Sequence, residues 1–222
     1  MLFPGPLAVA RSFVQMGVDG RLAAGVAKSL GRLAQGYLIS VGVGVPLGVA
    51  LARWQWLQLG LKPLVAGLQA LPSICWLPLS ILWFGLSESA IVFVVVMGSL
   101  LSVTIATEDG IRAIPPQLLN VSSTLGIRGL RLYVGVLLPA ALPSIVTGLK
   151  LGWSFAWRAL MAGELLFVAG GLGQLLTMGR ELLDVAQVMA VMVTIMGLGV
   201  ATDRLLFQTV ESRVRERWGL SA

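Results

Sequence analysis

Histidine is absent from the 222 residues of this sequence, and cysteine occurs only once. Without histidine, neither a histidine metal site nor a Ser-His-Asp triad can be built. The single Cys75 excludes a disulfide within the chain, and its place in an apolar run indicates a small core residue. These absences argue against a Ser-His-Asp hydrolase and against a fold held together by histidine-bound metals or disulfides.

A phosphate-binding lysine and a normal share of charge are also missing. No G-x-x-x-x-G-K-[ST] pattern surrounds Lys28, Lys62 or Lys150, so the chain has no P-loop of its own for ATP. Charged residues make up 12% of the chain, against about 25% in a typical soluble domain. With 57% hydrophobic residues and a mean hydropathy of +0.90, the composition predicts an all-α integral membrane protein.

Long apolar runs mark the expected membrane crossings. The first run contains Gly44 and Gly48, a small-xxx-small pair that permits close helix contact. Prolines in the second run predict a kink or a late entry near Leu71, because proline removes backbone donors. About five transmembrane helices are expected, in the runs Leu33–Ala52, Pro63–Ser87, Ser89–Thr107, Pro139–Gly163 and Val185–Thr202.

Residues 165–179 are uncharged but hold four glycines, which disfavour a stable helix. Fifteen residues are also short for a crossing that takes about 20. This segment is predicted to be an external loop with a short interfacial helix.

Lys and Arg positions predict the orientation of the chain. If residues 108–138 are cytoplasmic, the larger share of Lys and Arg lies on that side, with 203–222 as a cytoplasmic tail and 1–28 as an external or interfacial segment. The net charge of +6 is then explained by cytoplasmic loops in contact with membrane lipid, and no nucleic acid partner is expected. Five crossings with a cytoplasmic C-terminus would place the N-terminus outside, but Met1–Ala10 lacks the features of a signal peptide. We therefore expect a further N-terminal helix before it, which makes six transmembrane helices.

The stretch 120–139 carries the strongest functional motif. Gly126 is followed, after nine residues, by Val136-Leu137-Leu138-Pro139. This spacing resembles the signature of permease subunits of ABC (ATP-binding-cassette) importers, usually written EAA, with a glycine and a terminal I-x-L-P. Three further runs, 71–85, 138–145 and 157–164, are similar to the nitrate, sulfonate, taurine and bicarbonate branch of these permeases. The resemblance covers residues 29 to about 218.

The resemblance implies a type I (MetI-like) permease bundle that forms one transmembrane permease domain over residues 1–222. It implies that the chain is a non-catalytic subunit of a bacterial cytoplasmic (inner) membrane importer. No cofactor is expected in this chain, and ATP and Mg would lie on the partner ATPase. The implied partners are ABC ATPase subunits, an external solute-binding protein and a second permease copy, with a homodimer expected.

The predicted contact with the ATPase is residues 115–131, with the motif positions Asn120, Val121, Ser122, Gly126, Arg128, Leu138 and Pro139. Pro115-Pro116 suits the first turn of a short helix, and Gly126 reaches a positive φ at little cost. The sequence departs from the signature at its start, where Asn120 replaces the acidic residue and Val121 and Ser122 replace the alanines. Gly126, Leu138 and Pro139 keep their places, so the helix-turn-helix outline is retained. Taken alone, the segment is more readily an ordinary basic cytoplasmic loop, but the Gly-to-Pro spacing and the flanking runs argue against that reading.

The fourth run holds charges that are costly inside a membrane, at about 2.5–3.5 kcal/mol each. At 100° per residue, Lys150 and Arg158 lie about 80° apart on one polar and aromatic stripe. An anion path would use such a stripe, because Arg binds oxyanions in a bidentate way. The candidate pathway residues are Lys150, Ser154, Trp157, Arg158, Met161 and Glu164, with Glu164 placed at the outer mouth or bonded to a neighbouring helix. Snorkelling or pairing within a dimer is the alternative for Lys150 and Arg158.

The function that these features favour is ATP-driven import of a small solute, most readily an oxyanion such as sulfonate, nitrate, taurine or bicarbonate. A stand-alone secondary transporter is the main alternative, although no internal repeat or central coupling acid is visible. An intramembrane enzyme lacks a nucleophile with a base, and a membrane scaffold leaves Lys150 and Arg158 unexplained. The sequence does not identify the solute.

Overall fold

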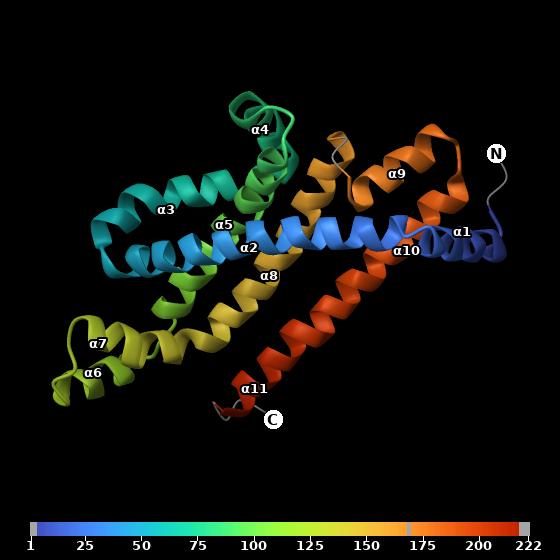
Figure 1. Ribbon diagram of the computed structural model, residues 1–222. Helices are drawn as coiled ribbons and strands as arrows, with labels where there is room; N and C mark the ends of the chain where they lie inside the picture. The colour runs from blue at the N-terminus through green and yellow to red at the C-terminus, as the bar shows by residue number, and fades with distance from the viewer. Residues whose placement is uncertain (1–3, 168–169, 218–222) are drawn as a thin grey trace.

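The computed structural model describes residues 4–167 and 170–217, and these residues form helices and no strands, which confirms the all-α fold class (Figure 1). The elements are α1 (Pro6–Val18), α2 (Arg21–Arg53), α3 (Gln55–Gln69), the 3₁₀ turn η1 (Ser73–Trp76), α4 (Leu77–Phe84), α5 (Glu88–Arg112), α6 (Pro116–Thr124), α7 (Leu130–Leu132), the π-helical η2 (Tyr133–Leu137), α8 (Leu138–Leu166), α9 (Leu172–Glu181), α10 (Val185–Thr202), the π-helical η3 (Asp203–Gln208) and α11 (Thr209–Arg217).

In the described part of the chain, four helical stretches are long and apolar enough to cross a membrane: Arg21–Arg53, Glu88–Arg112, Tyr133–Leu166 and Val185–Val214. The pair formed by Gln55–Gln69 and Ser73–Phe84 adds a fifth if it counts as one span, bent by 104°. The bend falls at residues 70–72, where a kink near Leu71 was predicted. The prolines explain the break, since Pro72 has no N–H with which to continue the helix.

The expected bounds were accurate for the last crossing and too short for the first. Helix α10 spans Val185–Thr202 as predicted, whereas α2 begins at Arg21 rather than Leu33. The helix does not begin at the expected crossing boundary, because Arg32 lies inside α2 and is buried against acidic partners. The 33 residues of α2 rise about 50 Å, more than the roughly 30 Å of bilayer hydrocarbon.

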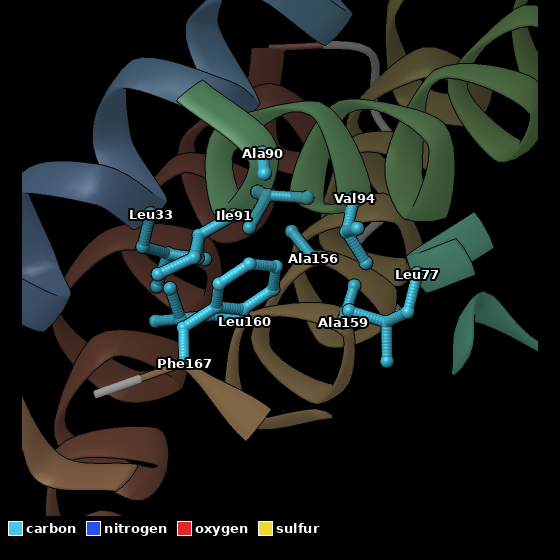
Figure 2. Packing of buried hydrophobic residues seen from close by; sticks show 10 residues of the cluster. Leu33, Leu77, Ala90, Ile91, Val94, Ala156, Ala159, Leu160 and Phe167 are labelled. Carbon is cyan, nitrogen blue, oxygen red and sulfur yellow. The ribbon is translucent and has the colours of Figure 1, made fainter. Parts of the chain in front are cut away.

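Helices α2, α5 and α8 form the centre of the fold through small residues. Gly48 of α2 lies so close to α5 that an added Cβ would be 2.5 Å from the carbonyl oxygen of Thr104, and Gly44 makes a similar approach. The predicted small-xxx-small contact is therefore confirmed. Figure 2 shows the adjoining apolar cluster, in which Leu33 of α2, Ile91 of α5 and Leu160 of α8 meet.

The connecting elements gather at opposite ends of this three-helix core. Figure 1 shows α6 and α7 at one end, with α4 and α9 toward the other. Helix α9 confirms the short helix expected within 165–179, although it begins at Leu172 and extends to Glu181. The glycines do not prevent this helix. Gly171, at φ 103°, lies just before its first residue, and Gly173 and Gly179 lie where close neighbours leave no room for a side chain.

Candidate functional site

The predicted ATPase-contact segment forms a short helix followed by a glycine turn. Helix α6 begins at Pro116, directly after Pro115, as the proline pair predicts. Gly126 has a φ of 72°, and the Ile127 N–H donates to the Ser122 carbonyl at 2.9 Å to close the turn. The chain then returns through η2 to Leu138 and Pro139, which begin α8.

Helix α6 presents apolar side chains on its outer surface. Asn120, Val121 and Arg128 are exposed, while Ser122 is buried and donates to the Leu118 carbonyl at 2.7 Å. The exposed apolar residues of the segment are Leu118, Leu119, Val121 and Leu125. A large apolar surface on a short helix outside the core is typical of a protein interaction site.

A small apolar cluster fixes the base of this segment. Ile111 and Ile114, at the end of α5 and just after it, pack with Leu137 of η2 and with Ala141 and Ile145 near the start of α8. The two helices that flank α6 are thereby joined at their ends.

The predicted pathway stripe of α8 divides between different neighbours. Lys150 pairs with Asp203 of η3 at 3.0 Å, and Ser154 donates to the Lys150 carbonyl at 3.3 Å. Trp157 and Met161 pack against the apolar core clusters. Arg158 is exposed and faces a cavity, so the structure does not bring the six residues to a common surface.

The cavity next to Arg158 has a volume of about 360 Å³ and lies at the break between α3 and η1. Its polar lining comes from Arg158, Gln69, Ser73 and Ser102, and its aromatic lining from Trp76 and Phe155. The Arg158 guanidinium carbon lies 5.2 Å from the centroid of the Phe155 ring. The three uncharged polar side chains, together with one guanidinium, are suited to a small anion that also has an apolar part.

Glu164 is buried in a network at the other end of α8. Its carboxylate accepts from Arg32 at 2.8 Å, from the Ser29 hydroxyl at 2.7 Å and from the Gly173 N–H at 3.0 Å. Arg32 also donates to the Gly170 carbonyl and pairs with Glu88 at 3.0 Å. The prediction that Glu164 bonds a neighbouring helix is confirmed, because Ser29 and Arg32 both belong to α2.

Sequence reasoning missed a second buried carboxylate, Glu108 in α5. Lys62 of α3 pairs with it at 2.5 Å, and Arg112, one turn further along α5, at 2.7 Å. The (i, i+4) spacing of Glu108 and Arg112 was a visible signal for this pair. The partnership with Lys62 was not visible, since it depends on how α3 packs against α5.

Within residues 4–167 and 170–217, no group of three or more Cys, Asp and Glu side chains is arranged to hold a metal ion. Several buried charged groups of the described residues are engaged in ion pairs between helices, such as Glu164 with Arg32 and Glu108 with Lys62. Among the features described above, the α6 surface is the candidate for binding a partner protein, and the Arg158 cavity is the candidate for binding a solute.

Comparison with known proteins places these features in a family context. Residues 44–216 match the family described as binding-protein-dependent transport system inner membrane component. A putative ABC transporter permease protein of Methanocaldococcus jannaschii is 33% identical over 177 residues, which cover 79% of this chain and 66% of that protein. The putative aliphatic sulfonates transport permease protein of Escherichia coli is 32% identical over 198 residues, or 88% of this chain and 75% of that protein.

The nitrate import permease protein of Leptolyngbya laminosa is 35% identical over 157 residues, covering 71% of this chain and 56% of that protein. Among solved structures, a chain of the MetNI methionine ABC transporter, from inward-facing conformations, has a TM-score of 0.73 and 22% identity. That likeness covers 90% of this chain and 97% of the other, and it concerns the fold.

Proposed function

The chain belongs to the family of binding-protein-dependent transport system inner membrane components, and from this premise we propose that it forms the path of an ATP-driven importer for a small oxyanion. Family membership makes it an ABC permease component and a multi-pass protein of the inner membrane, with at least four crossing helices. A stand-alone secondary transporter is not favoured for a member of a family that depends on binding proteins.

The α6 segment is the proposed docking site for the ATPase. Residues 115–131 form a short helix and turn outside the core, with exposed leucines and Val121 on the surface. Asn120 stands where an acidic residue is usual in the family signature, so the contact relies on apolar side chains and on Arg128 rather than on a carboxylate. ATP and Mg belong to the partner ATPase, and this chain supplies the surface that moves when the ATPase closes.

The Arg158 cavity carries the proposal of an oxyanion. Arg158 is the one charged residue in the cavity lining, whereas Lys150 and Glu164 are engaged with Asp203 and Arg32. A guanidinium gives paired donors to a sulfonate, nitrate or carboxylate group. The names of the similar permeases from Escherichia coli and Leptolyngbya laminosa refer to aliphatic sulfonates and nitrate, and both are oxyanions.

A second copy of this chain is the proposed partner in the membrane, with an external binding protein delivering the solute. Exposed apolar side chains along α2, α4 and α10, such as Leu38, Leu82 and Met196, need lipid or protein cover. A pair of chains would cover part of this apolar surface and shield the path from lipid.

Co-purification with the ATPase tests the docking proposal. The chain is co-expressed with the ATPase encoded beside its gene, and ATP hydrolysis is measured in lipid for wild type, Gly126→Pro and Val121→Glu. Both variants are expected to lose co-purification and hydrolysis, because one alters the turn and the other charges the apolar surface. Arg21→Gln, in an exposed ion pair with Asp19, is the matched control. Failure of wild type to bind the ATPase would reject the proposal.

Uptake of solutes tests the oxyanion proposal. Proteoliposomes that contain the whole importer are assayed with a sulfonate, taurine, nitrate and bicarbonate. Arg158→Gln is expected to lower uptake of the preferred anion by roughly 10- to 100-fold, because that is the effect of losing one charge-assisted hydrogen bond. Arg158→Lys is expected to retain part of it. Equal uptake by wild type and Arg158→Gln would remove Arg158 from the path.

A further inference from the structure

Polar side chains join α3 to α5 along their whole contact. Arg112 donates to Gln58 at one end, Lys62 pairs with Glu108 at 2.5 Å and with Asp109 at 3.3 Å, and Gln69 donates to Ser102 at 3.4 Å at the other end. Residue numbers rise along α3 while they fall along α5, so the helices run antiparallel. We name these four contacts the α3–α5 seam.

In the described part of the chain, the hydrogen bonds and ion pairs made by α3 side chains go to α5. All fifteen residues of α3 are described, and Val65 alone among them is buried. Helix association in a membrane gains little from apolar burial and depends on close packing and on polar contacts. Glu108 is fully buried and Lys62 is partly exposed, so the carboxylate is the fixed half of the pair and the lysine follows it.

One end of the seam lies beside the proposed ATPase contact. Arg112 is the last residue of α5, and Pro116, four positions later, begins α6. The corner between them is packed by the cluster that contains Ile111, Ile114 and Leu137. Movement of α6 therefore carries the end of α5 that bears Glu108 and Arg112.

The other end of the seam lies in the Arg158 cavity. Gln69 and Ser102 both line that cavity, as do Leu71 and Pro72 at the bend after α3. From Lys62 to Gln69 the helix rises about 10 Å without a break. Pro63, directly after Lys62, lies inside α3, and the helix continues past it to Gln69. A displacement imposed on Lys62 is therefore carried to the cavity wall along one continuous helix.

We propose that Glu108 is a positioning residue for transport, which holds Lys62 so that movement of α6 shifts α3 and the Gln69–Pro72 wall of the Arg158 cavity. The proposal rests on the proposed function, since the movement originates from an ATPase docked on α6. The seam has two arrangements in this scheme, and closure of the ATPase selects between them. Glu108 itself contacts no solute.

Cys75 provides a native reporter for the test. It is the only cysteine of the chain, it is exposed, and it lies in η1 between Ser73 and Trp76 of the cavity lining. The purified complex with its ATPase is placed in lipid, and alkylation of Cys75 by a maleimide is timed without nucleotide and with ATP plus vanadate. Peptide mass spectrometry assigns the modified cysteine to this chain.

In wild type the alkylation rate is expected to change by at least about fivefold on nucleotide trapping, the lower range of typical coupling between sites. Glu108→Gln is expected to reduce this change to below about twofold while ATP hydrolysis continues. Lys62→Gln is expected to act in the same direction, and Glu108→Asp to restore part of the response. Arg21→Gln, remote from the seam, is expected to match wild type.

Each outcome bears on the proposal. A full change in the Cys75 alkylation rate in Glu108→Gln would overturn the proposal and leave the ATPase contact intact. The same conclusion would follow if the wild type hydrolysed ATP but showed no change in the Cys75 alkylation rate. If Glu108→Gln fails to assemble with the ATPase, the Cys75 response of Lys62→Gln tests the proposal instead. In that variant Glu108 keeps Arg112 as its charged partner. If wild type binds no ATPase, the proposed function fails first and this inference with it.

Discussion

Glu164 in α8 and Glu108 in α5 are both buried carboxylates, yet their partners differ in kind. Glu164 accepts from the Arg32 guanidinium, a hydroxyl and a backbone N–H, all within the folded interior. Glu108 is paired with the side chains of Lys62 and Arg112, which are 32% and 43% exposed. One carboxylate is bound by a fixed cage and the other by two cations that reach solvent.

The difference separates a rigid end of the molecule from an adjustable one. A cage that includes backbone groups of the 170–173 turn permits one geometry, so α2, α8 and α9 are locked together where Glu164 lies. Glu108 is held by side chains alone, so α3 and α5 stay paired at Glu108 while they move together relative to the other helices. Motion driven from α6 is accordingly expected at the Glu108 end, with the Glu164 end as the fixed point.

The largest expected effect comes from removing the charge at the rigid end. Glu164→Gln removes the buried carboxylate 2.8 Å from Arg32, which is itself buried and keeps the more exposed Glu88 as a partner at 3.0 Å. Breaking a buried pair in this way typically lowers the free energy of unfolding by about 3–5 kcal/mol. Thermal unfolding of the purified chain in detergent checks this.

Glu108→Gln is the matched comparison for Glu164→Gln. Its loss of stability is expected to be smaller, because Lys62 and Arg112 can turn toward solvent. Equal losses at the two sites would end the distinction between a rigid and an adjustable end.

A methyl group added at the rigid end is expected to have the next largest effect. Alanine at Gly173 would overlap Cβ and the carbonyl of Glu164. Such overpacking usually costs about 1–3 kcal/mol, which thermal unfolding would detect. Gly60 of α3, where an added Cβ meets nothing within 4 Å, is the control. Gly60→Ala is expected to be neutral or to stabilise by about 0.5–1 kcal/mol, and a destabilisation as large as that of Gly173→Ala would refute the comparison.

The smallest effect is expected from the exposed edge of the Arg32 network. Lys28 pairs with Glu88 at 2.9 Å, with both side chains about half exposed. Exposed pairs contribute about 0–1 kcal/mol, and Arg32 continues to hold Glu88 when the lysine is lost. Lys28→Gln is therefore expected to shift the unfolding temperature little, and less still at high salt. A large shift would mean that the network extends to the surface.

Much of the architecture was predictable because it depends on local composition. Uncharged runs located the crossings, the proline cluster located the bend near Leu71, and Gly126 located the turn after α6. Errors arose where a charged residue continues a helix. Arg32 was taken as the end of a crossing, but its charge is tolerated inside α2 because acidic residues distant in sequence neutralise it.

The site was predictable in part for the same reason. Helical spacing placed Lys150 and Arg158 in one crossing of α8, and the (i, i+4) rule makes Glu108 and Arg112 neighbours. Spacing along one helix says nothing of which helix lies opposite. The pairing of Lys150 with Asp203, and of Arg158 with the cavity, depends on where η3, α3 and η1 pack.

By itself the sequence determined that this is an all-helical membrane protein of the ABC permease type, because hydropathy and the 120–139 motif are local properties. Only the tertiary structure decided which buried charges are bound in a rigid cage and which are held by adjustable cations. That decision rests on contacts between α2 and α8 and between α3 and α5. Those contacts join residues as far apart in the sequence as Arg32 and Glu164, and no local pattern encodes them.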